Sequence, residues 1–168
     1  MRRIALLIDQ PDWHARRLGR AIAERGAEAV LCSLRDCAFR LGEGGAGIDI
    51  PGFGGALPDA VLVRSIAAGS FEQVTLRLGL LHALAASGVT VVNDARAIER
   101  CVDKSMTSFL LHRAGLPTPA TLVSESEAVA QRWRTARAEA QVAKPLFGSQ
   151  GRDLVRLAPE DALPPLES

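Results

Sequence analysis

The stretch AKPLFGSQGRDLVRL, residues 143–157, contains a lysine at the end of a short apolar run, a polar loop flanked by glycines, and a second apolar run. A loop that joins two strand-like runs directly predicts an antiparallel hairpin, with strands over Gln141–Pro145 and Leu154–Leu157. Walker A and dinucleotide-binding loops both need a helix N-terminus behind the loop. The sequence therefore excludes both of those nucleotide sites here.

The loop itself still has the residues of an anion site. Gly148 and Gly151 would let backbone N–H groups approach an anion without a side chain in the way, and Ser149 would add a hydroxyl donor. Lys144 could direct its ammonium at the same oxygens. An ordinary flexible hairpin is the alternative that this spacing leaves open.

The use of lysine is unusual. Of the 20 basic residues, 18 are arginine, and the two lysines are Lys104 and Lys144. A compact ammonium approaches a phosphate oxygen as a point charge, where the wider planar guanidinium would not fit. Codon bias with two stray lysines is the alternative explanation.

Residues 1–100 alternate between strand and helix patterns, which predicts a parallel sheet with right-handed crossovers, a Rossmann-like unit. Asp12 is expected to cap the first helix, and Ser70-Phe71-Glu72-Gln73 is a capping box for a later one that ends near Ser87. The glycine-rich segment 41–57 is expected to be irregular. The expected strands are Arg3–Ile8, Glu28–Ser33, Ala60–Arg64 and Val89–Asn93.

The pattern changes in the second part of the chain. Helices are expected over Ala95–Cys101 and Ser105–Ala114, with Asp94 and Asp103 as caps, followed by a strand-like run over Thr121–Val123. A second capping box, residues 124–127, predicts a polar, exposed helix to about Ala138, and the hairpin follows. We place a domain boundary accordingly, with a Rossmann-like domain over residues 1–101 and an incomplete α+β lobe over residues 102–168.

Arg64 ends the third predicted strand at the carboxyl edge of the sheet, where open α/β sheets bind ligands. An arginine that merely leaves the core for solvent is the alternative. Asp9 has the same placement after the first strand. The histidines are scattered on predicted helices and are expected at the surface, whereas Trp13 and Trp133 are expected to pack.

The composition is that of an ordinary globular protein, 48% hydrophobic and 23% charged. A net charge of +1 gives no bulk attraction to nucleic acid. No apolar run approaches the roughly 18 residues of a membrane span. The three cysteines lack paired metal-ligand spacing, so reduced thiols in a cytoplasmic protein are expected.

Three segments in order carry a family resemblance: NDARAIERCVDK (93–104), LLHRAGLPTP (110–119) and KPLFGSQG (144–151). Together they resemble ATP-grasp ligases of the RimK type, and the likeness extends from Met1 to about Leu157. It implies a Rossmann-like pre-ATP-grasp domain followed by part of an ATP-grasp N-terminal lobe. Within the family, the sequence most resembles the branch that adds glutamate to tetrahydromethanopterin-type coenzymes.

The resemblance implies transfer of the γ-phosphate of ATP to a carboxylate, followed by attack of an amine such as that of glutamate on the acyl phosphate. It assigns no catalytic and no metal-binding residue to this chain, and it implies ATP and Mg²⁺, with the metal ligands outside the chain. The implied partners are ATP, a small carboxylate substrate and an amino acid. Arg64 would face the substrate, and the residues implied to bind ATP are Lys104, Lys144, Gly148, Ser149, Gln150 and Gly151.

Two departures from the family pattern matter. Asp153 stands where many relatives have a third glycine, and the acidic cluster that binds Mg²⁺ in the family does not follow the loop. We therefore expect a shortened chain that does not turn over alone. Exposed apolar surface around Val142 and Val155 is expected, and with it self-association or a mobile region after residue 120.

Two other functions stay open at this point. One is a non-catalytic module that binds a partner or substrate through its Rossmann-like domain. The other is a small Rossmann-like nucleotide-binding protein, although Asp9-Gln10-Pro11 stands where a glycine fingerprint would follow the first strand.

Overall fold

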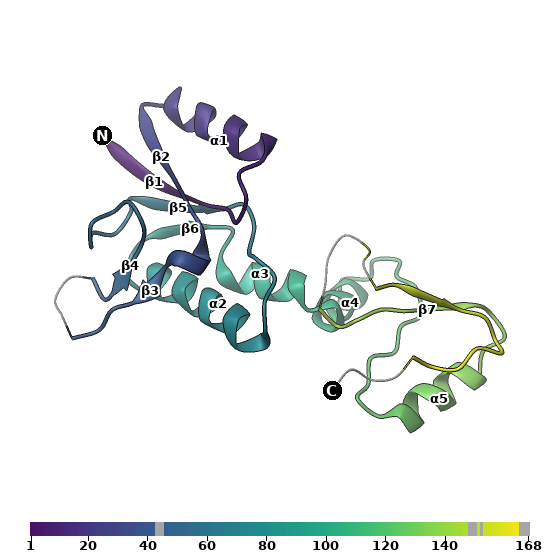
Figure 1. The fold of residues 1–168 in the computed structure, drawn as a ribbon. Coiled ribbons are helices and arrows are strands. Elements are labelled where there is room, and N and C mark those ends of the chain that lie inside the picture. Colours follow the sequence, from purple (N-terminus) through teal and green to yellow (C-terminus); the bar gives the residue numbers. More distant parts are fainter. Residues whose placement is uncertain (43–45, 148–150, 152, 165–168) are drawn as a thin grey trace. The chain divides into compact units, whose positions relative to one another are not determined.

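The computed structural model describes residues 1–42, 46–147, 151 and 153–164. It divides into two compact units, Met1–Glu99 and Arg100–Ser168, which are described separately (Figure 1). The predicted boundary between residues 101 and 102 remains a prediction. No described helix is long and apolar enough to cross a membrane.

The first unit is built on a parallel sheet of four strands in the order β2-β1-β5-β6. The predicted strands are confirmed, and each end lies within one residue of its predicted position. Figure 1 shows the sheet with its helices. The strands are β1 (Arg2–Leu7), β2 (Ala27–Cys32), β5 (Ala60–Val63) and β6 (Thr90–Val92); the helices are α1 (Trp13–Ala23), the short 3-10 helix η1 (Leu34–Asp36), α2 (Phe71–Ala86) and α3 (Ala95–Val102).

The central strands alternate their side chains between two apolar layers, because successive residues of a strand point to opposite faces. Leu6 and Ile8 pack with Ala15 of α1 on one face. Ala5 and Leu7 belong to a larger cluster on the other face, together with Leu80, Leu81 and Leu84 of α2. The two helices therefore cover opposite faces of the sheet.

The predicted caps of these helices are confirmed. Asp12 accepts the N–H of Ala15 at the start of α1, and both bonds of the predicted capping box of α2 are made, between Ser70 and Gln73. Asp94 accepts the N–H of Ala97. The local chemistry of these sequences is enough to set where each helix begins.

The segment over residues 41–57 is less irregular than expected. It contains β4 (Ile48–Asp49), which pairs antiparallel with β3 (Ala38–Phe39). Ile48, Ile50 and Phe53 are buried in the larger core cluster. The burial of these three residues could not be predicted, because they stand in a glycine-rich segment and follow no helix or strand period long enough to detect.

The second unit contains α4 (Lys104–Arg113), α5 (Glu127–Thr135), β7 (Gln141–Ala143) and β8 (Val155–Leu157), besides the end of α3. The antiparallel hairpin of β7 and β8 is confirmed, as is Asp103 as the cap of α4. Two predictions were wrong: Thr121–Val123 forms no strand, and Ser126 rather than Ser124 caps α5.

Burial in the second unit is sparse. Arg134 and Leu157 are the buried residues among those that the structure describes there. Val142 is 53% exposed and Val155 42%, which confirms the predicted exposure of the hairpin. Arg134 corrects the expectation of a fully exposed helix, since its guanidinium donates to the carbonyls of Ala158 and Pro159.

Candidate functional site

The carboxyl edge of the parallel sheet is the first candidate site. The chain passes from β1 to β2 on one side and then to β5 on the other, so the order of the strands reverses at β1. In open α/β sheets, ligands bind in the crevice outside the carboxyl ends of the strands at such a switch point. Both acidic and basic candidates lie there: Asp9 is two residues after β1, and Arg64 directly follows β5.

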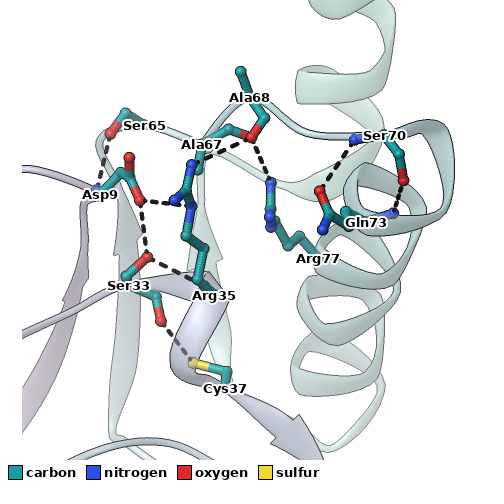
Figure 2. A network of polar contacts seen from close by, with 10 residues as sticks. All are labelled: Asp9, Ser33, Arg35, Cys37, Ser65, Ala67, Ala68, Ser70, Gln73 and Arg77. Carbon is teal, nitrogen blue, oxygen red and sulfur yellow. Dashed lines mark hydrogen bonds and ion pairs between the residues drawn. The ribbon is translucent and has the colours of Figure 1, made fainter.

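Asp9 is held in place by groups from the segments that follow the two neighbouring strands, β2 and β5. Its carboxylate pairs with Arg35 Nε at 3.1 Å and accepts from the hydroxyl of Ser33 at 3.3 Å, and its N–H donates to the hydroxyl of Ser65 at 3.4 Å. Figure 2 shows these side chains converging on Asp9. Its charge is thus already compensated by Arg35, and the carboxylate is 26% exposed.

A buried arginine fixes the segment that follows β5. Arg77 of α2 is 6% exposed and donates to the carbonyl of Ala67 at 2.6 Å and to that of Ala68 at 3.4 Å. Gly69 packs so closely against Gln73 and Arg77 that a Cβ would overlap Gln73 Oε1. The role of Arg77 is to hold this segment in place, as Figure 2 shows.

A shallow hollow of about 360 Å³ opens beside this network, and its lining residues are Leu34, Arg35, Cys37, Gln73, Leu76 and Arg77. Hydrogen bonding with Cys32, together with burial, raises the pKa of the Cys37 thiol. The thiol donates to the carbonyl of Ser33 at 3.4 Å. Because the thiolate is the nucleophilic form of cysteine, the hollow presents no reactive sulfur at neutral pH.

Arg64 lies on the α1 side of the same edge. Its Nη2 is 3.4 Å from Asp12 Oδ2 and 3.1 Å from His14 Nδ1, and its side chain is 36% exposed. The pKa of Asp12 is lowered, mainly by the hydrogen bond that its carboxylate accepts from Ala15 N–H. The hydrogen bond with His14 and the positive charge of Arg64 lower it further. Arg64 is therefore anchored beside an ionised carboxylate, with part of its guanidinium open to solvent.

The second candidate site lies in the second unit, where the structure brings Lys104 to the segment between β7 and the glycine loop. Lys104 opens α4, and its ammonium donates to the carbonyl of Leu146 at 3.3 Å. Lys144, two residues before Leu146, is exposed. The predicted residues Gly148, Ser149 and Gln150 lie outside the described residues.

The backbone at the far end of the loop favours glycine. Gly151 has φ +69°, and Asp153 has φ +59°, both in the left-handed region. A residue with a Cβ is uncommon at such φ values, and aspartate is among those that tolerate it. Asp153, which replaces the third glycine of many relatives, therefore has a backbone conformation that favours glycine.

The described residues differ in how well they suit the two groups that the resemblance implies. Two lysines beside a glycine-containing loop suit the phosphates of ATP. By contrast, no group of three or more His, Cys, Asp or Glu that could hold a metal ion occurs in the part of the chain that the structure describes. This part therefore does not fit a magnesium centre.

The sequence indicated some of these residues and not others. Arg64 and Asp9 stand at or just after the end of a predicted strand; Ser33 and Ser65 have the same placement, so the same signal could have found them. Arg77 had no signal, because an arginine inside a helix is usually solvated. Trp13 was expected to pack but is 60% exposed.

Comparison with known proteins gives these features a context. The family model of the RimK PreATP-grasp domain matches residues 1–98. A tetrahydromethanopterin:alpha-L-glutamate ligase of Methanosarcina acetivorans is 36% identical over 162 residues, 94% of this chain and 50% of the relative. A ligase of the same name from Methanocaldococcus jannaschii is 34% identical over 102 residues, 61% of this chain and 33% of the relative.

Solved structures agree with this relationship. The RimK domain protein ATP-grasp from Sphaerobacter thermophilus superimposes with a TM-score of 0.67 at 28% identity, covering 93% of this chain and 53% of that one. The ATP-grasp ligase PsnB, complexed with a phosphomimetic variant of its minimal precursor, Mg and ADP, gives 0.62 at 25% identity, covering 92% and 57%. The chain thus spans half or less of the length of these two curated relatives.

Proposed function

Because the chain belongs to the RimK PreATP-grasp domain family, we propose that it serves an ATP-dependent carboxylate–amine ligase that adds glutamate to a small carboxylate acceptor. The observation that carries this proposal is 36% identity to a tetrahydromethanopterin:alpha-L-glutamate ligase over 94% of the chain. The chain would supply the pre-ATP-grasp domain and the first part of the nucleotide site.

The proposed reaction has two steps. An acceptor carboxylate oxygen attacks the γ-phosphorus of ATP, and the bond to the β–γ bridging oxygen breaks, which gives an acyl phosphate and ADP. The amine of glutamate then attacks the acyl carbon, phosphate leaves, and the nitrogen loses a proton. Positioning and charge compensation are the protein's main contributions to such phosphoryl transfer.

The described lysines have a role in the first step. Lys144 and Lys104 would offset the charge of the phosphate oxygens, which spreads in the transition state. The contact of Lys104 with Leu146 supports this role, since it holds the start of α4 against the segment that leads from β7 into the loop. We derive no step through magnesium from the described residues, because they hold no cluster for it.

Arg64 would bind the acceptor in the first unit. It stands at the switch point of the sheet, and a planar guanidinium recognises a carboxylate with two parallel hydrogen bonds. Binding of tetrahydromethanopterin to the 168-residue chain tests this role. Arg64→Ala should weaken binding about tenfold or more, since charge-assisted hydrogen bonds are lost. Arg20→Ala, which removes an exposed arginine paired with Glu24 at 2.9 Å, is the matched control.

The activity is tested by ADP release with ATP, Mg²⁺, glutamate and tetrahydromethanopterin, with the full-length Methanosarcina acetivorans relative as the positive control. We expect the 168-residue chain to bind both ligands and to release no ADP alone, since its described residues supply no metal cluster. Turnover by the chain alone would refute the proposal that it supplies only the first part of the nucleotide site. Tetrahydromethanopterin binding that Arg64→Ala leaves unchanged would refute the acceptor site.

A further inference from the structure

Three polar atoms form a triangle where α1 begins at the carboxyl edge of the sheet. His14 Nδ1 lies 3.0 Å from Asp12 Oδ2 and 3.1 Å from Arg64 Nη2, and the third side, from Arg64 to Asp12, is 3.4 Å. Each pair is within reach of a hydrogen bond or ion pair. The side chains are 36–54% exposed, so a ligand from solvent can reach them.

The three contacts cannot all be hydrogen bonds at once. Arg64 can only donate and the Asp12 carboxylate can only accept, whereas His14 Nδ1 carries either a proton or a lone pair. Without a proton, Nδ1 accepts from Arg64 and faces the Asp12 carboxylate as a second acceptor. With a proton, it donates to Asp12 and opposes the donor of Arg64. The protonation state of His14 thus decides which partner it binds.

We infer that protonation of His14 transfers its Nδ1 from Arg64 to Asp12 and releases the Arg64 guanidinium for an anionic ligand at this edge. His14 is then a positioning residue that acts through Arg64. The identity of the ligand as the carboxylate acceptor rests on the proposed function, whereas the exchange of partners does not. Binding of the anion is therefore favoured when His14 is protonated.

The surroundings permit this exchange without loss of the helix cap. Asp12 uses its other oxygen, Oδ1, to accept the N–H of Ala15 at 2.8 Å. The pKa of Asp12 is lowered, first by the hydrogen bond from Ala15 N–H, so its carboxylate stays ionised and can accept from a protonated His14. The ring of Trp13 stands edge-on to His14, with centroids 5.1 Å apart.

The other charged groups near the triangle are engaged elsewhere. On α1, Arg17 lies over the ring of Trp13, 5.8 Å from its centroid. Asp9, two residues after β1, and Arg35 of η1 pair with each other at 3.1 Å. Among the described residues, Asp12 and Arg64 are therefore the charged groups in direct contact with His14.

Nitrogen-15 NMR of the imidazole rings in the full 168-residue chain tests the exchange. Above its midpoint, His14 should carry its proton on Nε2, with Nδ1 unprotonated. Arg64→Met should raise the midpoint and Asp12→Asn should lower it, each by about half a unit or more. His82, whose Nε2 contacts Glu99 at 2.7 Å, should not respond to either change. A proton on Nδ1 above the midpoint would overturn the inference.

Titration with sulfate, which keeps its charge over this range, tests the release of Arg64. Sulfate should bind about five-fold or more tightly one pH unit below the His14 midpoint than one unit above it. His14→Leu should abolish this dependence and His82→Gln should preserve it. If the NMR results hold but Arg64→Met binds sulfate as well as the parent, the anion role of Arg64 is wrong, and the acceptor site of the proposed function fails with it. If sulfate binding depends on Arg64 but not on His14, the inference alone is overturned.

Discussion

The backbone N–H and the ammonium of Lys104 both donate to the carbonyl oxygen of Leu146, at 3.4 and 3.3 Å. Lys104 thus ties the first turn of α4 to the segment that leads from β7 into the glycine loop. This contact joins two of the three segments that carry the family resemblance, although 42 residues separate them in the sequence.

The contact predicts that lysine at position 104 is not replaceable by arginine. Lys104→Arg should weaken Mg-ATP binding about tenfold or more, because the guanidinium fork cannot approach the carbonyl and a phosphate as a point donor does. Displacement of a fluorescent ATP analogue measures the effect. Arg113→Lys, at the other end of the same helix, should have no effect. Equal affinities of Lys104→Arg and the parent would contradict the role.

The first unit should be sensitive at Gly52 and tolerant at Gly79. Gly52 has φ +84°, and a Cβ there would come within 2.7 Å of Val30 Cγ1, so Gly52→Ala should cost about 1–3 kcal/mol. A Cβ at Gly79, inside α2, meets nothing within 4 Å. Gly79→Ala should therefore raise the free energy of unfolding by about 0.5–1 kcal/mol. Urea unfolding compares the two. A stabilised Gly52→Ala variant would be evidence against the close packing of Gly52 on Val30 of β2.

The cap of α4 should make the second unit sensitive to acid. The hydrogen bond from the Ser105 hydroxyl, followed by that from Met106 N–H, lowers the pKa of Asp103 below 3.8. A lowered pKa gives stability that is fully present above the unfolded value and is lost as the pH falls through the folded value. Thermal unfolding between about pH 6 and pH 2 should show this loss.

Two variants distinguish this cause from general acid unfolding. Asp103→Asn can still cap the helix but does not titrate, so its melting temperature should approach that of the parent as the pH falls. Ser105→Ala removes the largest cause of the lowered pKa, and its acid loss should begin at a higher pH. The same acid profile in all three proteins would contradict the assigned cap.

Much of the fold could be predicted because its signals are local. The strands of the sheet are short apolar runs, and Asp12, Ser70 and Asp103 begin helices through hydrogen bonds to residues two or three positions away. The antiparallel pairing of β7 and β8 was predicted from the direct loop between them. Such features depend on residues that are close in the sequence, so sequence patterns are enough to predict them.

The remainder depends on contacts between distant residues. Phe53 is buried because the segment around β4 folds onto the sheet, and nothing in a glycine-rich stretch announces that. The triangle of Asp12, His14 and Arg64 forms across 52 residues of chain, so His14 was expected to be an ordinary surface histidine. His14 is a surface residue, but its contacts with Asp12 and Arg64 could not be predicted from the spacing of residues in the sequence.

The central claim is that this chain holds part of an ATP site, and isothermal titration of Mg-ATP into the 168-residue chain tests it most directly. We predict binding with a dissociation constant of about 1 mM or tighter, lost in Lys144→Ala and retained in Arg132→Ala, which removes an exposed arginine of α5. The absence of heat with the parent chain, or equal binding by Lys144→Ala, would contradict the account.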